Sequence, residues 1–481
     1  MYPGEGDLIR LAKMPATATL PFLSFCEGTH TIQAMDEGKT SKQQITPIAV
    51  TNWRDIRKIF GIKEKNRRGH MYIVGKTGTG KSSLIANMAL SDIRAGNGIG
   101  LLDPHGDLSE DILNRIPKER IDDVVYFNPA DLEYPVGFNP LERVPRDRQH
   151  LIVSGVISVF RKIWSEFWGP RLEHILRYSL FTLLEYPGST LLDLPKLLTN
   201  PGFRKEVLTH VNRKEVLSFW LNEFDKYSAW LRSEAVSPIL NKVGQFLVNL
   251  PLRNIIGQTK STFDLKAVVD GKKILIVNLA KGKIGEDNTS VLGSLLLTEI
   301  WLSVLRRAQV SETERTPFYL YVDEFHSFIT LSFADILSES RKYGLNIIMA
   351  HQYLNQLDEK VRGAIFGNVG SIVSFRVGAE DAKHLAREFS PFMEEDFINL
   401  PNYEIYLRLM IDGVTSRPFS ATTLQLERPS LSNSRDIVET SRTRYGRKRD
   451  WVEHSTSRQR TGSSSNSDQD QKEFRNQSTL L

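Results

Sequence analysis

The chain has 481 residues, of which 40% are hydrophobic and 25% are charged, and its formal net charge is +5 at pH 7. This composition is that of a soluble globular protein with more than one domain, and it excludes a wholly disordered chain. Because Cys26 is the single cysteine, the composition also excludes an intramolecular disulfide framework and a cysteine-ligated zinc site, and it favours a cytoplasmic location.

Regular elements are expected to begin near residue 47, since residues 1–46 form a poorly defined segment with no sustained hydrophobic period. Beyond it, short continuous runs of β-branched and aromatic residues alternate with long helical patterns. Continuous runs are typical of parallel strands that helices cover on both faces. The sequence therefore predicts an α/β fold with a mainly parallel sheet, built from residues 47–149 and 258–428. The expected strands are 71–74, 99–102, 124–127, 274–279, 318–322, 346–350 and 372–377.

Residues 150–257 interrupt this alternation, because their patterns are almost wholly helical. We expect an all-α domain inserted between two strands of the sheet. Its aromatic residues could stack on nucleic-acid bases, but packing between helices is the simpler explanation. These aromatic residues are Trp164, Phe167, Trp168, Phe219, Trp220, Phe224 and Trp230.

No membrane span is expected, because no segment reaches the roughly 18 apolar residues that a span needs. The most apolar stretch, 291–305, is interrupted by polar residues and is predicted to be a buried helix. The last segment, 429–481, is rich in Ser, Arg, Gln, Asn and Asp and is predicted to be a disordered tail. Within it, the basic cluster 442–449 either contacts nucleic acid or an acidic partner, or is a solvated run of charge.

A glycine-rich segment follows the predicted strand 71–74 and precedes a predicted helix over 82–94. Its glycines allow backbone N–H groups to point inward at phosphate oxygens, and the start of the helix adds the positive end of its dipole. In this motif Lys81 reaches the β- and γ-phosphates and Ser82 is a ligand of Mg²⁺. The sequence therefore predicts a binding site for ATP and Mg²⁺. Its residues are Gly75, Lys76, Thr77, Gly78, Thr79, Gly80, Lys81, Ser82 and Ser83.

Two acidic residues, Asp323 and Glu324, end the predicted strand 318–322. In P-loop ATPases the first acid holds Mg²⁺ and the second activates the attacking water. Glu324 therefore indicates hydrolysis rather than passive nucleotide binding. The next predicted strand ends in His351 and Gln352, either of which could sense the γ-phosphate; Gln352 is preferred, and His351 is expected to be structural.

Together these motifs resemble those of the FtsK–HerA superfamily of DNA-pumping ATPases, and within it the coupling proteins of conjugative type IV secretion. The resemblance covers about residues 47–423. It implies a RecA-like P-loop core with an inserted all-α domain, and a homohexameric ring around DNA. It also implies a secretion or relaxase-type protein partner. The segments that carry it are 68–82, 102–107, 278–286, 321–325, 341–344, 350–353 and 375–378.

The same resemblance implies roles for single residues. Arg341 is the expected arginine finger, reaching the nucleotide of the neighbouring subunit, and Gln352 is the expected sensor. Arg376 is a second candidate finger and Arg362 a third. Such a guanidinium stabilises charge on the transferring phosphoryl group.

Few residues of the sequence point to contacts with DNA. Lys281 and Lys283 lie on a predicted glycine-containing loop after a strand and are candidates for contacts to the DNA backbone. A plain connection between strand and helix is the simpler explanation. Coupling proteins usually carry N-terminal membrane helices, and none is expected here, so the resemblance does not imply membrane anchoring.

The expected function is that of an ATP-hydrolysing DNA translocase. A HerA-like ATPase of DNA processing or defence, and a protein-secretion motor of the same superfamily, are the alternatives. A third class, a nucleotide switch or scaffold, is disfavoured by Glu324 and by an arginine acting between subunits.

Overall fold

The computed structural model describes residues 44–52, 57–142, 144–330, 332–429 and 432–461. Most of the predicted N-terminal segment, including Cys26, and the last part of the predicted tail lie outside these residues.

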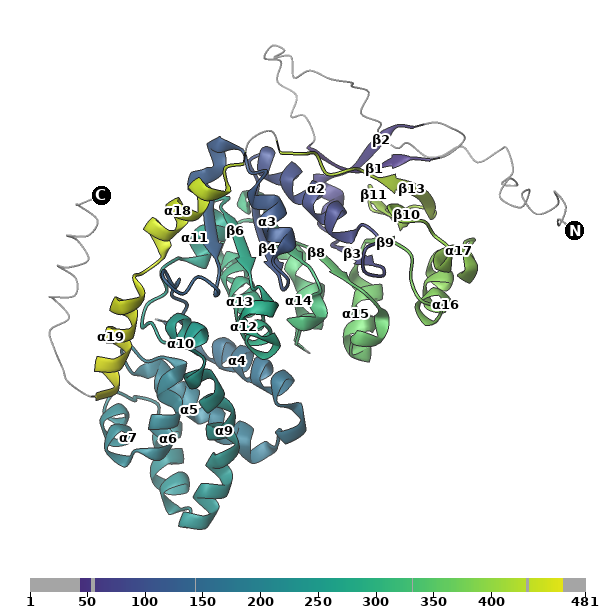
Figure 1. The fold of residues 1–481 in the computed structure, drawn as a ribbon. Helices are drawn as coiled ribbons and strands as arrows, with labels where there is room; N and C mark the ends of the chain where they lie inside the picture. Colours follow the sequence, from purple (N-terminus) through teal and green to yellow (C-terminus); the bar gives the residue numbers. More distant parts are fainter. Residues whose placement is uncertain (1–43, 53–56, 143, 331, 430–431, 462–481) are drawn as a thin grey trace, which may run out of the picture.

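The described residues form an 11-stranded sheet in the order β2-β1-β13-β10-β9-β3-β8-β7-β4-β6-β5 (Figure 1). The strands from β9 to β5 in this order pair in parallel, and the four at the other end pair antiparallel. A separate hairpin joins β11 (Met410–Ile411) and β12 (Val414–Thr415). The sheet strands are β1 (Ile45–Thr51), β2 (Ile59–Lys63), β3 (Met71–Val74), β4 (Gly98–Asp103), β5 (Val124–Phe127), β6 (Ile274–Asn278), β7 (Phe318–Val322), β8 (Leu345–His351), β9 (Ser371–Ser374), β10 (Glu404–Arg408) and β13 (Phe419–Thr423).

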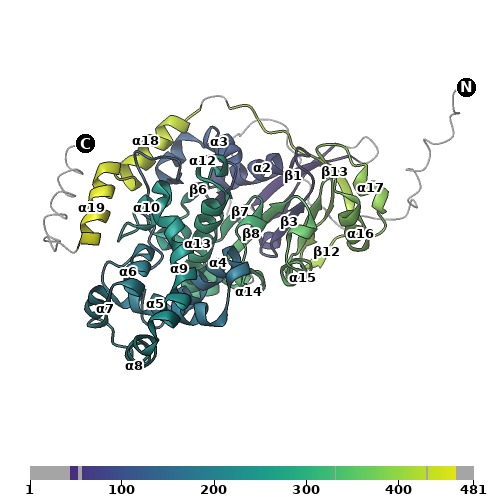
Figure 2. The same cartoon turned by 60° about the horizontal axis from the view of Figure 1, so that its bottom comes forward.

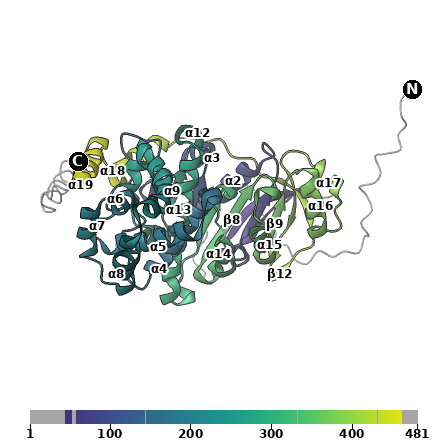
Figure 3. The same ribbon diagram turned by 90° about the horizontal axis from the view of Figure 1, so that it is seen from below.

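The continuous apolar runs are buried on both faces, which confirms the predicted α/β fold. Along β7, Tyr319 and Tyr321 point into one hydrophobic core, while the residues between and beside them point into the other. The first core lies under α2 (Lys81–Arg94) and α3 (Asp107–Leu113). The second lies under α13 (Glu286–Leu305), α14 (Phe333–Glu339), α15 (Glu359–Asn368) and α16 (Ala379–Glu388) (Figure 3). The shorter helices are α1 (Glu64–Arg67), α11 (Leu265–Asp270), α12 (Lys281–Ile284) and α17 (Glu394–Ile398).

One described segment, residues 286–309, is long and apolar enough to cross a membrane by length and composition alone. It comprises α13 and the short turn after it, and 67% of its most apolar window is buried inside the protein. Val291, Leu292 and Ile300 are fully buried in the core. This is the buried helix that the sequence predicted.

In the described part of the chain, seven of the helices that follow β5, α4 to α10, form the inserted all-α domain, seen below the sheet in Figure 1, and α11 lies between this domain and β6. The insertion is a helix bundle, as predicted, and four of the aromatic residues named above belong to its core: Trp164, Phe219, Trp220 and Phe224 are at most 3% exposed. Trp230 differs, with 73% of its surface exposed. The helices are α4 (Gln149–Ile163), α5 (Pro170–Glu185), α6 (Leu194–Thr199), α7 (Pro201–Leu208), α8 (Lys214–Ser218), α9 (Ala229–Val248) and α10 (Leu250–Ile256).

The predicted disordered tail is wrong for residues 434–461, which form α18 (Ser434–Tyr445) and α19 (Arg449–Thr461). The two helices run along one side of the molecule, α18 beside the edge of the sheet and α19 beside the all-α domain (Figures 1 and 2). Ile437 and Val452 are fully buried. A few well-placed apolar residues therefore anchor a segment whose overall composition is polar.

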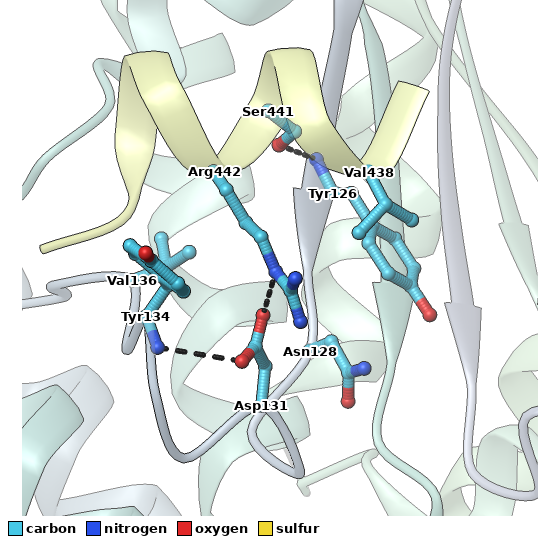
Figure 4. Close-up of a pocket in the computed structure, with 8 residues that line it drawn as sticks. All are labelled: Tyr126, Asn128, Asp131, Tyr134, Val136, Val438, Ser441 and Arg442. Carbon is cyan, nitrogen blue, oxygen red and sulfur yellow. Dashed lines mark hydrogen bonds and ion pairs between the residues drawn. The ribbon is translucent and has the colours of Figure 1, made fainter. Parts of the chain in front are cut away.

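The basic cluster 442–449 is used in this packing. Arg442 Nε donates to Asp131 Oδ2 at 2.7 Å, and the N–H of Tyr126 on β5 donates to Ser441 Oγ at 2.9 Å (Figure 4). Arg444 likewise pairs with Asp122 at 2.6 Å. Part of the cluster therefore pairs with acidic residues of the same chain, while the side chains of Arg442 and Arg444 remain 41% and 43% exposed.

Candidate nucleotide site

The glycine-rich loop joins the carboxyl end of β3 to the start of α2. It turns at Gly78 and Gly80, whose φ angles of 77° and 117° are left-handed values that suit glycine. Thr79 Oγ1 closes the loop by donating to the carbonyl of Lys76 at 2.7 Å. A Cβ at Gly78 would meet no atom within 4 Å. The loop therefore has open space beside it and backbone geometry suited to an anion cradle.

Lys81 begins α2 and folds back over the loop. Its Nζ donates to the carbonyls of Gly75 at 2.6 Å and Lys76 at 3.2 Å. Burial lowers the pKa of Lys81, and the carboxylates of Glu324 and Asp323 oppose that shift. The ammonium group of Lys81 is thus held beside the loop by two backbone carbonyls, which phosphate oxygens can replace as its hydrogen-bond acceptors. On the same turn, Ser82 is exposed and Ser83 is half-buried.

Asp323 and Glu324 follow β7 at the same edge of the sheet as the loop. The N–H of Asp323 donates to the carbonyl of Leu102 at 3.0 Å, which extends the ladder with β4. Burial, together with the neighbouring carboxylates of Glu324 and Asp103, raises the pKa of Asp323 to about 7. Asp323 thus lies near two further carboxylates and one lysine, so the positive charge beside it does not balance the three acids.

The two carboxylate oxygens of Glu324 differ, because one accepts a hydrogen bond and the other, the open oxygen, accepts none from the described residues. Oε1 accepts a hydrogen bond from Gln352 Nε2 at 2.9 Å. Oε2 is buried without a hydrogen-bond partner in the described part of the chain, and it lies 3.5 Å from Nδ1 of His326. The backbone of Glu324 is left-handed, with φ of 43°, a conformation that costs about 1–3 kcal/mol and occurs mainly at functional sites. The open oxygen can accept a proton from a water.

His351 and Gln352 end β8 but face different surroundings. The ring of His351 is fully buried, with Nδ1 3.2 Å from the hydroxyl of Tyr72, and its carbonyl accepts from the N–H of Gly75 at 3.3 Å. These contacts fix the junction between β8 and the glycine-rich loop. Gln352 is therefore the residue of the two that contacts the acid.

Sequence reasoning missed two neighbours of this site. Asp103 ends β4, and its carboxylate accepts from the N–H groups of His105 at 2.9 Å and Ser109 at 2.8 Å. It lies within a segment that carries the family resemblance, but no role was predicted for it. His326 had no signal beyond its place two residues after Glu324.

The three arginines proposed as fingers lie in different places. Arg341 is exposed and precedes β8, whose seven residues separate it from the nucleotide edge by about 20 Å at the rise of a strand. Among the described residues it has no ion-pair partner. Arg376 follows β9 beside the loop, and its carbonyl accepts from the N–H of Lys76 at 2.8 Å. Arg362 lies half-buried on α15.

The predicted loop at 281–283 is a short helix, α12. The N–H of Gly285 closes the helical turn by donating to the carbonyl of Lys281 at 2.9 Å, and the N–H of Lys281 donates to the carbonyl of Pro104 at 2.7 Å. Lys281 Nζ lies 3.8 Å from Glu286 Oε2.

Comparison with known proteins finds one matching family model and several similar structures. Residues 55–390 match the family model of the type IV secretion-system coupling protein DNA-binding domain. The structure is similar to the bacterial conjugative coupling protein TrwBΔN70 in its unbound form, with 17% identity and a TM-score of 0.57 over 82% of this chain and 92% of that one. It is also similar to TrwB in complex with ADP and Mg²⁺, with 18% identity and a TM-score of 0.57 over 81% and 92% of the two chains.

A third similar structure is VirB4 of Thermoanaerobacter pseudethanolicus, with 14% identity and a TM-score of 0.55 over 80% of this chain and 97% of that one. Structural likeness at these identities shows a common fold. A search of curated proteins gives no match. The family model, in contrast, covers well over half of the chain, from the strands before the glycine-rich loop to the helix after β9. The chain therefore belongs to the type IV secretion-system coupling protein family.

Proposed function

We propose that this chain is a cytoplasmic, ATP-hydrolysing motor that moves DNA as a homohexameric ring. The observation that carries the proposal is the gathering of Lys81, Asp323, Glu324 and Gln352 at one edge of the sheet, around a glycine-rich loop with open space beside it. Family membership supports DNA as the cargo. The solved complexes of TrwB with ADP and Mg²⁺ and with non-hydrolysable ATP and GTP analogues support the ligand class.

The residues fit ATP and Mg²⁺. The loop N–H groups and Lys81 would hold the phosphates, and Ser82 with Asp323 would hold Mg²⁺, which neutralises charge on the phosphate oxygens. The raised pKa of Asp323 reflects burial and crowding by carboxylates, a state that a divalent cation relieves.

Three further residues of this chain have separate roles in hydrolysis. Glu324 accepts the proton of the attacking water through its open oxygen, and Gln352 orients Glu324 through their 2.9 Å hydrogen bond. Arg341 supplies positive charge to the nucleotide of a neighbouring subunit. An assembly is required for that step, because β8 separates Arg341 from the nucleotide edge of its own chain.

ATP turnover measured with and without single- and double-stranded DNA, across salt concentrations, tests the proposal. We expect DNA to raise turnover and the stimulation to fall steeply with salt, because contacts to the backbone release counterions. No stimulation by either form of DNA would contradict the motor and would favour a protein-secretion motor instead.

Three variants test the roles in the site. Lys81→Ala should abolish turnover, and Glu324→Gln should bind ATP without hydrolysing it, while Glu339→Gln, an exposed acid on α14, should turn over normally. Mixing the inactive Lys81→Ala and Arg341→Ala variants should restore activity, because some interfaces then pair an intact loop with an intact arginine. A mixture that stays inactive would refute the role of Arg341 between subunits. Lys342→Ala, the neighbouring exposed cation, is the matched control.

A further inference from the structure

The order of the strands determines on which side of the loop the nucleoside lies. β8 and β7, which carry Gln352 and Glu324, lie on one side of β3, and β9 and β10 lie on the other. If the γ-phosphate points toward Glu324, as the proposed function requires, the nucleoside must leave the loop on the side of β9 and β10. The residues that follow β9 and precede β10 are therefore the candidates to meet the base.

Tyr403 immediately precedes β10 and packs on the loop. Its N–H donates to the carbonyl of Thr79 at 2.8 Å. A Cβ built on Gly80 would come within 2.9 Å of Cδ1 of the Tyr403 ring, so the ring lies directly against the last glycine of the loop. On the other side, the carbonyl of Tyr403 accepts from the N–H of Thr423 at 2.8 Å and from its Oγ1 at 3.1 Å. The backbone of Tyr403 is thus held between the loop and β13.

The conformation of Tyr403 is unusual for a tyrosine. Its φ is 67°, in the left-handed region that disfavours residues with a side chain, and 51% of its surface is exposed. A half-exposed ring contributes little to the core, so core packing does not explain why an aromatic residue is kept in a strained position. The fixed backbone therefore holds a half-exposed aromatic side chain beside the loop.

Arg376 contacts the residues just before Tyr403. Its Nη2 donates to Asn402 Oδ1 at 2.8 Å and its Nη1 lies 3.5 Å from the carbonyl of Leu400, while its own carbonyl accepts from the N–H of Lys76. The guanidinium is therefore tied to the chain segment that carries Tyr403, on the nucleoside side of the loop. This placement in the same chain favours a positioning role over that of a second arginine finger.

We propose that Tyr403 is the stacking platform for the purine base of the nucleotide bound at the glycine-rich loop. The proposal rests on the proposed function for the direction of the phosphates. Stacking uses the face of the base, and every base has such a face. The platform therefore accepts guanine as well as adenine, and the substrates that it implies include GTP rather than ATP alone.

Binding of ADP, GDP and inorganic tripolyphosphate, each with Mg²⁺, to the full chain tests the proposal. The loss variant is Tyr403→Asn, because asparagine tolerates the left-handed backbone without supplying a ring. We expect it to weaken ADP and GDP binding by about 5- to 150-fold, the range of stacking on an aromatic side chain, and to leave tripolyphosphate binding unchanged. Tyr403→Phe should keep the wild-type affinities.

Tyr353→Asn is the matched control, since Tyr353 is 48% exposed and follows Gln352 on the opposite side of the loop. Equal ADP affinity in Tyr403→Asn and wild type would overturn the platform, as would loss of base-dependent affinity in Tyr353→Asn alone. In the Tyr403→Trp variant, ADP should quench tryptophan fluorescence that tripolyphosphate leaves unchanged, and equal responses to the two ligands would also overturn it. Failure of the wild type to bind any of the three ligands would instead refute the proposed function.

Discussion

A buried ion pair connects the helix that follows the glycine-rich loop to the acidic strand. Arg67 Nη1 and Nη2 donate to the two carboxylate oxygens of Asp92 on α2, at 2.6 and 2.9 Å. The side chains are 2% and 0% exposed. The hydroxyl of Tyr321, two residues before Asp323, donates to the same carboxylate at 2.5 Å. Removing one partner would leave a charge buried without compensation.

We therefore expect Asp92→Ala to lower the free energy of unfolding by about 3–5 kcal/mol, the cost of breaking a buried pair from one side. Urea denaturation followed by circular dichroism measures this change. The control is Glu427→Ala, which removes the exposed partner of Arg94 on the same helix (51% and 78% exposed, 3.3 Å) and should cost less than about 1 kcal/mol.

The double variant Arg67→Met with Asp92→Leu tests whether the loss comes from the unpaired charge. Since it removes both charges and keeps much of the volume, it should recover most of the lost stability. A loss in Asp92→Ala no larger than that in Glu427→Ala would refute the reasoning, because the pair would then behave as if solvent screened it.

Three further predictions concern a buried lysine, the last helix and the binding of Mg²⁺. Lys162 donates to the carbonyls of His326 and Ser327, and burial lowers its pKa to about 7. Because the folded state then binds fewer protons than the unfolded state, the free energy of unfolding should rise between pH 7 and about 10. Thermal denaturation of Lys162→Met should show a flatter dependence of stability on pH over this range. Val452→Asp should release α19 from the all-α domain, seen as faster hydrogen exchange in α19 than in the wild type, and unchanged exchange would refute its anchoring role. Chelation of Mg²⁺ by EDTA should stop turnover reversibly, and Asp323→Asn should raise the Mg²⁺ concentration needed for half-maximal rate; an unchanged requirement would exclude Asp323 as a ligand.

The central strands were predictable because a strand that is buried on both faces is a continuous run of apolar residues in the sequence. Each of the parallel strands from β3 to β9 is a short apolar run bounded by polar or glycine residues, as in β6 and β7, where all five residues are buried. The antiparallel strands β1, β2, β10 and β13 were missed. They alternate between buried and half-exposed residues, as in Glu404–Arg408, and Pro47 and Gly61 weaken the pattern further. A short alternating run resembles a loop when its pairing partners are unknown.

The C-terminal helices were missed for a different reason. Their composition is polar, and their stability depends on partners more than 300 positions away in the sequence, such as Asp131 for Arg442 and Asp122 for Arg444. Long-range ion pairs leave no local pattern. The same limit applies to the site: the loop and the acid pair are motifs, whereas the contact of Tyr403 with Gly80 and the approach of His326 to Glu324 exist only after folding.

The position of Arg341 has a consequence for assembly. Its turn is tied to the start of β3, since Ser340 Oγ lies 3.2 Å from His70 Nε2 and the N–H of Ile347 donates to His70 Nδ1 at 3.1 Å. β3 in turn leads directly into the glycine-rich loop, so the turn and the loop sit at opposite ends of one rigid strand. Arg341 can therefore act on a phosphate only if its edge of the sheet meets the nucleotide edge of another copy. Such a contact joins two different surfaces, and repeated around an axis it closes into a ring or continues as an open helix. If Arg341 acts as proposed, the catalytic centre is shared between two copies and requires their head-to-tail arrangement.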